Sequence, residues 1–369
     1  MKPEPEARSA AATTPAALIR PEVLGMSPYH VADSRGMVKL DAMENPYGLP
    51  DALREQVARM VAEAPFNRYP DPGCTLLKAR LRKAMGVPTE MALLIGNGSD
   101  EIIQVLTLAV ARPGAVVMGV EPSFVMYRML AAAAGVRYVG VPLKPDFTFD
   151  AQALLNALEE HRPALLWLAY PNNPTGNLFD RQAMDRVIAA VPGIVVVDEA
   201  YHAFAGTSYL PELGRNPNLL VMRTLSKLGL AGVRLGFLAG PKQWLDQFDK
   251  LRLPYNVNVV SQLLAEALLA RSEVLDAQAA AIVGQRGELA RSLAMRPGVT
   301  VFPSAANFIL FRVGGAPAVF EAIKARRVLI KNLAGAHPLL ADCLRVTVST
   351  PEENGMFLEA LDAALIETQ

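Results

Sequence analysis

Short apolar runs alternate with longer amphipathic segments between residues 91 and 223. The apolar runs are rich in β-branched residues or leucine and predict buried strands, while the amphipathic segments predict helices. Continuous apolar strands separated by helices indicate an α/β fold with a mostly parallel sheet covered on both faces, and such sheets bind ligands at the carboxyl ends of their strands. The expected strands are 91–98, 115–120, 137–143, 164–170, 193–200 and 218–223, and the expected helices are 99–111, 123–135, 151–160 and 181–191.

The pattern changes after about residue 252. A long helical stretch is expected over 261–295, strands over 299–313 and 343–350, and a helix over 317–328. This order is typical of a smaller α+β domain. The expected parts are an N-terminal arm that packs with the small domain (1–40), a large domain (41–252) and a small C-terminal domain (253–369).

The composition argues against several classes of partner. The 369 residues are 51% apolar, and 36 basic residues balance 36 acidic ones without a basic run, which argues against nucleic acid. Two cysteines, Cys74 and Cys343, make neither a disulfide framework nor a metal site and suit a reducing compartment. The first residues lack the apolar segment of a signal peptide, and no apolar run is long enough to span a bilayer. We therefore expect a cytoplasmic protein with no metal and no membrane partner.

Two glycine- and asparagine-containing motifs follow predicted strands. In "GNGSDE" (96–101), the glycines permit a tight turn and a helix begins at Ser99, whose free amides attract phosphate. An ordinary glycine turn with a serine cap explains the same residues. "YPNNPTGN" (170–177) is an irregular loop whose amides can hold a ligand hydroxyl, although a plain turn is the alternative.

Two further motifs place charged side chains at strand ends. Asp198 ends the strand of "VVVDEAYHAF" (195–204), where a carboxylate is costly to bury unless a cation or donor pairs with it. A structural ion pair is the alternative. In "TLSKLGLAGVRLG" (224–236), partial desolvation favours the neutral amine of Lys227, a nucleophile towards aldehydes, while Arg234 suits a phosphate. Together the motifs provide for a phosphate, a phenolic oxygen, a ring nitrogen and an aldehyde, which describes pyridoxal phosphate.

The order of "GNGSDE", "YPNNPTG", "VVVDEAY", "TLSK" and "GVRLG" resembles the fold-type-I, class II aminotransferases, and more narrowly the histidinol-phosphate aminotransferase family. "MENPYG" (43–48), "NRYPDPGCTLLKARL" (67–81), "SAANFILFR" (304–312) and "LRVTVSTPEEN" (344–354) support this from about residue 20 to the end. The resemblance implies a seven-stranded, mostly parallel sheet in the large domain, and pyridoxal phosphate as the cofactor.

The resemblance also implies catalytic and cofactor-binding roles. Lys227 binds the cofactor aldehyde and later moves protons, Asp198 keeps the pyridine nitrogen protonated, and Asn173 and Tyr201 hydrogen-bond the phenolic oxygen. Tyr127 stacks on the cofactor ring. The residues implied at the cofactor phosphate are Gly98, Ser99, Asp100, Thr224, Ser226 and Arg234, joined by Tyr69 from the neighbouring subunit of a homodimer with shared sites.

One departure from the family pattern lies between Lys227 and Arg234. Relatives usually read "SKAFGLAG", whereas this chain reads "SKLGLAG" and is one residue shorter. We expect Gly229 and Gly232 to absorb the tighter loop, with some effect on the reach of Arg234.

On the substrate side, Arg345 matches the arginine that binds the substrate phosphate in the resembling enzymes. Lys331 stands where relatives often have a second arginine, although a solvated surface charge is the alternative. Tyr29 and Asn307 are further candidates, and Glu44 and Asn45 are expected to face the imidazole. His337 is expected to be a loop residue rather than a catalyst.

The reaction implied is transamination of L-histidinol phosphate with 2-oxoglutarate to imidazole acetol phosphate and glutamate, in histidine biosynthesis. An aromatic amino-acid aminotransferase is the nearest alternative and needs Arg345 to hold a carboxylate. A threonine-phosphate decarboxylase of the same fold would release carbon dioxide. A non-catalytic regulator that binds pyridoxal phosphate would need a DNA-binding domain, for which the N-terminal arm is too short and not basic.

Overall fold

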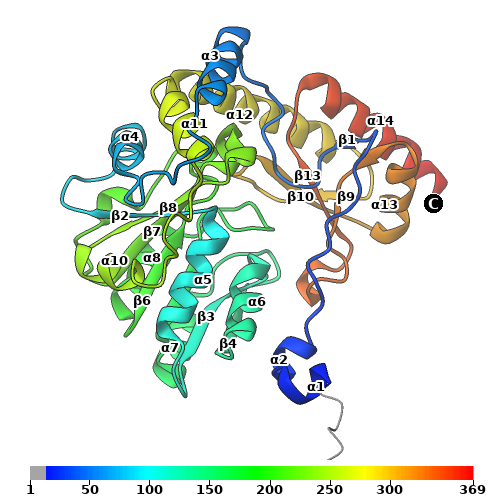
Figure 1. Cartoon of the computed structure of the whole chain (residues 1–369). Helices are drawn as coiled ribbons and strands as arrows, with labels where there is room; N and C mark the ends of the chain where they lie inside the picture. Colours follow the sequence, from blue (N-terminus) through cyan, green and yellow to red (C-terminus); the bar gives the residue numbers. More distant parts are fainter. Residues whose placement is uncertain (1–13, 369) are drawn as a thin grey trace, which may run out of the picture.

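A seven-stranded sheet forms the centre of the computed structural model, which describes residues 14–368 (Figure 1). Its strands lie in the order β2-β8-β7-β6-β5-β3-β4; β8 pairs antiparallel with both β2 and β7, and all other pairs are parallel. The α/β class and the seven-stranded, mostly parallel sheet that the family resemblance implies are confirmed. The strands are β2 (Ala92–Gly96), β3 (Val116–Glu121), β4 (Arg137–Pro142), β5 (Leu165–Ala169), β6 (Ile194–Asp198), β7 (Leu219–Thr224) and β8 (Gly236–Gly240).

Helices cover both faces of this sheet. One face packs against α5 (Ser99–Val110), α6 (Val125–Ala133) and α10 (Lys242–Phe248). The other face packs against α4 (Thr75–Met85), α7 (Ala151–His161), α8 (Arg181–Ala190) and α11 (Val259–Leu269). Because both faces are covered, the central strands β5, β6 and β7 consist of buried residues throughout, as their continuous apolar sequences predict.

A four-stranded antiparallel sheet builds the C-terminal part, in the order β12-β13-β10-β9. The expected strand 299–313 is two strands, because residues 302–307 form a loop, and the expected helix 261–295 breaks at Ala270 and Arg271. The elements are α12 (Ser272–Ala294), β9 (Val299–Val301), β10 (Phe308–Val313), α13 (Ala316–Ala325), β11 (Val328–Leu329), β12 (Lys331–Asn332), β13 (Cys343–Thr347) and α14 (Pro351–Glu367).

The N-terminal segment connects the two sheet-containing parts. Its strand β1 (Val38–Lys39) pairs in parallel with β11, and the amide of Met43 donates to Thr347 Oγ1 at 3.0 Å. Before it come α1 (Pro15–Leu18) and α2 (Pro21–Leu24), and after it α3 (Asp51–Ala62). The first 13 residues of the expected arm lie outside the described chain, and the three domain boundaries stay predictions.

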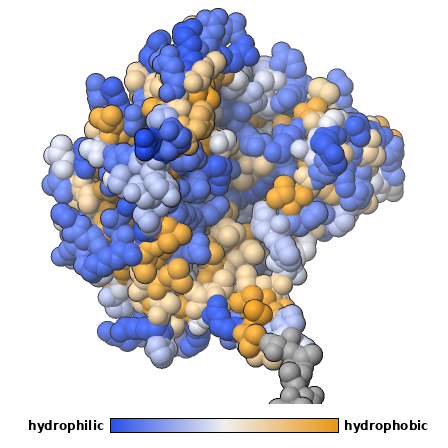
Figure 2. Space-filling model, in the orientation of Figure 1, coloured by the Kyte–Doolittle hydropathy of each residue, from blue (hydrophilic) through white to orange (hydrophobic). Residues whose placement is uncertain are grey.

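The molecule is hollowed between its two sheet-containing parts. The space-filling view shows this hollow on the face of Figure 1, with polar and apolar side chains around it (Figure 2). Within residues 14–368, no helix has the length and apolar character needed to cross a membrane.

A buried ion pair joins β6 to β7 directly behind the strand ends. Arg223 Nη2 lies 2.8 Å from Glu199 Oε2, and the two side chains are 7% and 0% exposed. Ser208 Oγ donates to both Glu199 oxygens, at 3.0 and 2.9 Å. Because Glu199 follows Asp198, this network fixes the end of the strand that carries Asp198.

We expect Arg223→Met to lower the free energy of unfolding by about 3–5 kcal/mol, because it leaves the Glu199 carboxylate buried without its cation. Urea denaturation followed by circular dichroism measures the change. Arg271→Met removes an arginine from the exposed pair with Glu273 and is expected to leave the midpoint unchanged. Equal shifts in the two variants would contradict a structural role for the buried pair.

Candidate active site

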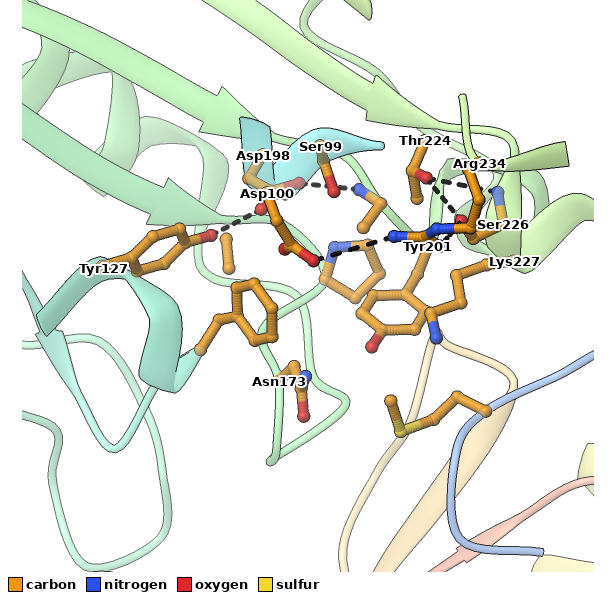
Figure 3. A pocket seen from close by; sticks show the side chains of 15 residues that line it. Ser99, Asp100, Tyr127, Asn173, Asp198, Tyr201, Thr224, Ser226, Lys227 and Arg234 are labelled. Atoms are coloured by element: carbon orange, nitrogen blue, oxygen red, sulfur yellow. Dashed lines mark hydrogen bonds and ion pairs between the residues drawn. The ribbon is translucent and has the colours of Figure 1, made fainter. Parts of the chain in front are cut away.

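A cavity opens at the carboxyl ends of the central parallel strands, where the sequence predicts a ligand site. Asp198 is the last residue of β6, Thr224 the last of β7 and Ala169 the last of β5. The cavity measures about 120 Å³, and its side chains converge from these strand ends and from the start of α5 (Figure 3). Its polar and charged lining residues are Ser99, Asp100, Tyr127, Asn173, Asp198, Tyr201, Thr224, Ser226, Lys227 and Arg234.

Lys227 follows β7 and presents its amine to this cavity. Its Nζ donates to the carbonyl of Ala42 at 2.9 Å, so the N-terminal segment holds the side chain in place. Burial and, next in size, the nearby positive charge of Arg345 lower the pKa of Lys227 to about 8. The neutral amine, which is the form that attacks an aldehyde, is therefore far more populated near physiological pH than in an ordinary lysine.

Asp198 is buried and has no cationic partner among the described residues. Tyr127 donates to its Oδ2 at 2.6 Å, and the amide of Ala200 donates to its Oδ1 at 3.0 Å. Burial raises the pKa of Asp198 to about 6, although both hydrogen bonds oppose that rise. A buried carboxylate with only neutral partners favours a ligand that brings a protonated nitrogen.

The opposite side of the cavity collects groups that can bind a phosphate. The helix α5 begins at Ser99, directly after Gly98, whose φ of +85° an L side chain rarely adopts. Thr224 Oγ1 donates to Ser226 Oγ at 3.0 Å, and Arg234 Nη1 lies 3.4 Å from the same oxygen. A helix start with free amides, two hydroxyls and a guanidinium is an anion site.

The shortened loop keeps Arg234 within reach of this anion site. Gly229 absorbs the tighter turn with a φ of +121°, and a Cβ there would lie 2.9 Å from Asn45 Nδ2. Gly232 lies in an ordinary helical turn without a positive φ. It therefore does not absorb the tighter loop, contrary to the expectation from the sequence. The left-handed residue at the other end of the loop is Arg234 itself, with a φ of +55°.

A second cavity of about 220 Å³ adjoins the first, because Met43, Phe124 and Asn173 line both. Arg345 and Lys331 line it from paired positions on β13 and β12, so their side chains share one face of the sheet. Arg345 is 7% exposed and donates to Asn173 Oδ1 at 2.6 Å. Tyr29 and the loop residue His337 also line this cavity, as does Glu121.

Three of the expected substrate residues line neither cavity within residues 14–368. Asn45 Nδ2 donates to the carbonyl of Leu228 and to Gln278, so its amide links chain segments instead of facing a ligand. Asn307 is fully buried and donates to the carbonyl of Met43 at 2.9 Å. Glu44 pairs with Lys39 at 2.7 Å. These contacts are structural, and the expected substrate roles of the three residues stay predictions.

Tyr127 lies differently from the expected stacking position. Its ring is fully buried and stacks on Trp167, with the centroids 4.8 Å apart, while its hydroxyl holds Asp198. Phe124, at the start of α6, lines both cavities. We therefore propose that Phe124 is the aromatic side chain that meets the cofactor ring. The spacing of "SFVMY" alone does not distinguish the two aromatic residues.

Tyr69 lies on the surface and is not among the residues that line either cavity of its own chain. Its side chain is 80% exposed and stacks on Tyr255 with ring centroids 4.3 Å apart.

The first cavity fits pyridoxal phosphate. Its buried carboxylate lacks a cation, its lysine amine has a lowered pKa, and its anion site is built from α5, Thr224, Ser226 and Arg234. Asn173 and Tyr201 line the same cavity and carry the amide and hydroxyl that a phenolic oxygen needs.

Comparisons with known proteins agree with this chemistry. A model of the aminotransferase class I and II family matches residues 35–361. Histidinol-phosphate aminotransferase 2 of Cupriavidus pinatubonensis is 56% identical over 353 residues, which cover 94% of this chain and 96% of that protein.

Two solved structures share the fold. The histidinol-phosphate aminotransferase of Sinorhizobium meliloti in complex with pyridoxal-5'-phosphate has a TM-score of 0.82 and 24% identity, over 96% of this chain and 99% of that one. The L-threonine-O-3-phosphate decarboxylase of Porphyromonas gingivalis has a TM-score of 0.77 and 21% identity, over 89% and 100%. Since a transferase and a decarboxylase share this fold, the fold alone does not identify the reaction.

We expect Lys227 in cofactor-free protein to react with acetic anhydride as an amine whose pKa is about 8. Burial disfavours the ammonium form, so the neutral, reactive form accumulates at a lower pH than in a model lysine, which titrates near about 10.4. Competitive labelling with mass spectrometry across pH 6–11 measures the midpoint. A midpoint at or above that of the model amine would contradict the desolvation of this site.

Proposed function

Because the chain belongs to the aminotransferase class I and II family, we propose that it transfers the amino group of L-histidinol phosphate to 2-oxoglutarate, yielding imidazole acetol phosphate and glutamate in histidine biosynthesis. The observation that carries the proposal is a pair of adjoining cavities. One joins the Lys227 amine to the anion site and Asp198, and the other contains the cations of Arg345 and Lys331.

Pyridoxal phosphate, when bound, supplies an aldehyde that captures amines and a ring that accepts electrons from a breaking bond. Asp198 would hold the ring nitrogen, and Asn173 and Tyr201 the phenolic oxygen. Burial raises the pKa of Tyr201, so its hydroxyl keeps its proton and remains a donor. Lys227 would take the proton from the donor Cα, because its lowered pKa makes it a base near neutral pH.

The second cavity supports a phosphorylated donor. Arg345 is permanently charged, and Lys331 stands beside it without a salt-bridge partner in the described chain. Two cations suit a phosphate dianion better than a single carboxylate, and each charge-assisted hydrogen bond contributes about 1.5–3 kcal/mol. The hydroxyl of Tyr29 adds a further donor on the same cavity.

The two rival reactions make different demands on Arg345. Phenylalanine and threonine phosphate each carry a carboxylate on the reacting carbon, whereas L-histidinol phosphate carries none. The paired cations of β12 and β13 favour a phosphorylated donor over phenylalanine, and the 56% identity to a histidinol-phosphate aminotransferase favours the proposed donor over both rivals.

We further propose a cytoplasmic homodimer with shared active sites. Tyr69 and Tyr255 form an exposed aromatic pair, and their segments also expose Phe66 and Leu253, which are 67% and 71% exposed. Large exposed apolar side chains in one region favour a protein partner. Both cysteines are free thiols, as suits a reducing compartment.

Lys227→Ala is expected to lower the rate of glutamate formation from L-histidinol phosphate and 2-oxoglutarate by at least about 10³-fold, because it removes both the nucleophile and the base. Coupled glutamate dehydrogenase measures the product. Lys242→Ala, which changes an exposed lysine of α10, is expected to retain the full rate. Full turnover by Lys227→Ala would overturn the mechanism, and carbon dioxide release from threonine phosphate by the unmodified protein would favour the decarboxylase.

Mixing Tyr69→Ala and Lys227→Ala proteins is expected to restore activity at a cofactor concentration where each variant alone is inactive. In a mixed dimer, one site combines the intact lysine of one subunit with the intact tyrosine of the other. After random exchange of subunits, about half of the dimers are mixed and each has one intact site, so about a quarter of all sites are active. Turnover after unfolding and refolding the mixture provides the measurement. A mixture as inactive as its components would contradict shared sites.

A further inference from the structure

Three polar side chains at the edge of the seven-stranded sheet line the second cavity and take no part in the steps above. Glu121 ends β3, Arg128 lies on α6 and Tyr138 lies on β4. Arg345 and Lys331, which line the same cavity, come instead from β13 and β12 of the four-stranded sheet. The cavity therefore has two cations from the four-stranded sheet and, on its other side, a carboxylate paired with its own cation, Arg128.

The Glu121 carboxylate is held at one oxygen and open at the other. Arg128 Nε donates to Oε1 at 2.8 Å, and Arg128 Nη2 donates to the same oxygen. Oε2 accepts no hydrogen bond from the described residues. The Arg128 guanidinium also lies over the Tyr138 ring, 4.8 Å from its centroid, so the arginine is fixed from two sides. The Glu121 side chain is 21% exposed.

Two glycines provide the space in which this cluster packs. A Cβ at Gly140 would lie 2.3 Å from Glu121 Cδ, and a Cβ at Gly119 would lie 2.6 Å from the Tyr138 hydroxyl. Gly119 and Gly140 are directly paired between β3 and β4. Neither glycine has a positive φ, so their missing side chains, rather than backbone freedom, determine where the carboxylate lies.

Resting on the proposed function, we infer that Glu121 is a specificity-determining residue that accepts a hydrogen bond from the imidazole N–H of the amino donor. An imidazole carries an N–H donor in both its neutral and protonated forms. The donor carries a phosphate dianion at one end and an imidazole at the other. The phosphate is attracted to Arg345 and Lys331 and repelled by Glu121, so the imidazole is the end that meets the Glu121 carboxylate. A phenyl ring offers no such donor, so the same carboxylate disfavours phenylalanine.

The test compares amino donors in single half-reactions of the cofactor-loaded protein, followed by stopped-flow absorbance. Glu121→Gln is expected to lower kcat/KM for L-histidinol phosphate by about tenfold, the effect of one charge-assisted hydrogen bond. L-Glutamate has no ring, so its kcat/KM is expected to stay within about twofold of the unmodified protein. The preference for L-histidinol phosphate over L-phenylalanine is expected to narrow.

Gly140→Ala provides a second variant that displaces the carboxylate without removing it, because the new Cβ would occupy its place. It is expected to show the same selective loss. Glu212→Gln is the matched control: Glu212 is 24% exposed and pairs with Arg181 and Arg215, away from both cavities. It is expected to leave both donors unaffected.

The outcomes separate this inference from the proposed function. The inference alone is overturned if the unmodified protein uses L-histidinol phosphate and Glu121→Gln either matches it or loses as much activity with L-glutamate as with L-histidinol phosphate. Unmodified protein that rejects L-histidinol phosphate overturns the proposed function and the inference together. A loss confined to L-histidinol phosphate in both Glu121→Gln and Gly140→Ala supports the inference.

Discussion

The burial of Asp198 without a cation is the constraint on which the rest of the site depends. A carboxylate at the end of a fully buried strand is costly, and here only the Tyr127 hydroxyl and the Ala200 amide stabilise it. The same loss of solvent raises the pKa of Asp198 to about 6 and lowers that of Lys227 to about 8. One physical cause thus prepares a carboxylate that favours a protonated nitrogen and an amine that can attack an aldehyde.

Parallel strands bring these groups together, but three regions of the chain complete the site. β6 and β7 end side by side and supply Asp198 and Thr224. The N-terminal segment contributes the Ala42 carbonyl that accepts from Lys227. The four-stranded sheet contributes Arg345, whose hydrogen bond to Asn173 connects it to the loop after β5. The two cavities therefore adjoin each other and share the lining residues Met43, Phe124 and Asn173.

The sequence predicts the site best where a motif is local. The strand ends, the helix start at Ser99 and the lysine loop each lie within a few residues, so their grouping follows from the parallel sheet. Side-chain direction does not follow from the motifs: Asn45 and Asn307 donate to backbone carbonyls, and the Tyr127 hydroxyl donates to Asp198. β8 was not located because its five residues begin and end with glycine. The Glu121–Arg128 pair depends on space left by Gly140 on a neighbouring strand, which no single motif reveals.

The most direct test of the central claim is the visible spectrum of the cofactor-loaded protein during separate additions of L-histidinol phosphate, L-phenylalanine and L-threonine phosphate. The arrangement of Lys227, Asp198 and the paired cations predicts that the cofactor band is lost on adding L-histidinol phosphate, at concentrations where the other two have no effect. Equal loss with phenylalanine would contradict the assigned donor. The absence of any cofactor band after loading would contradict the role assigned to Lys227.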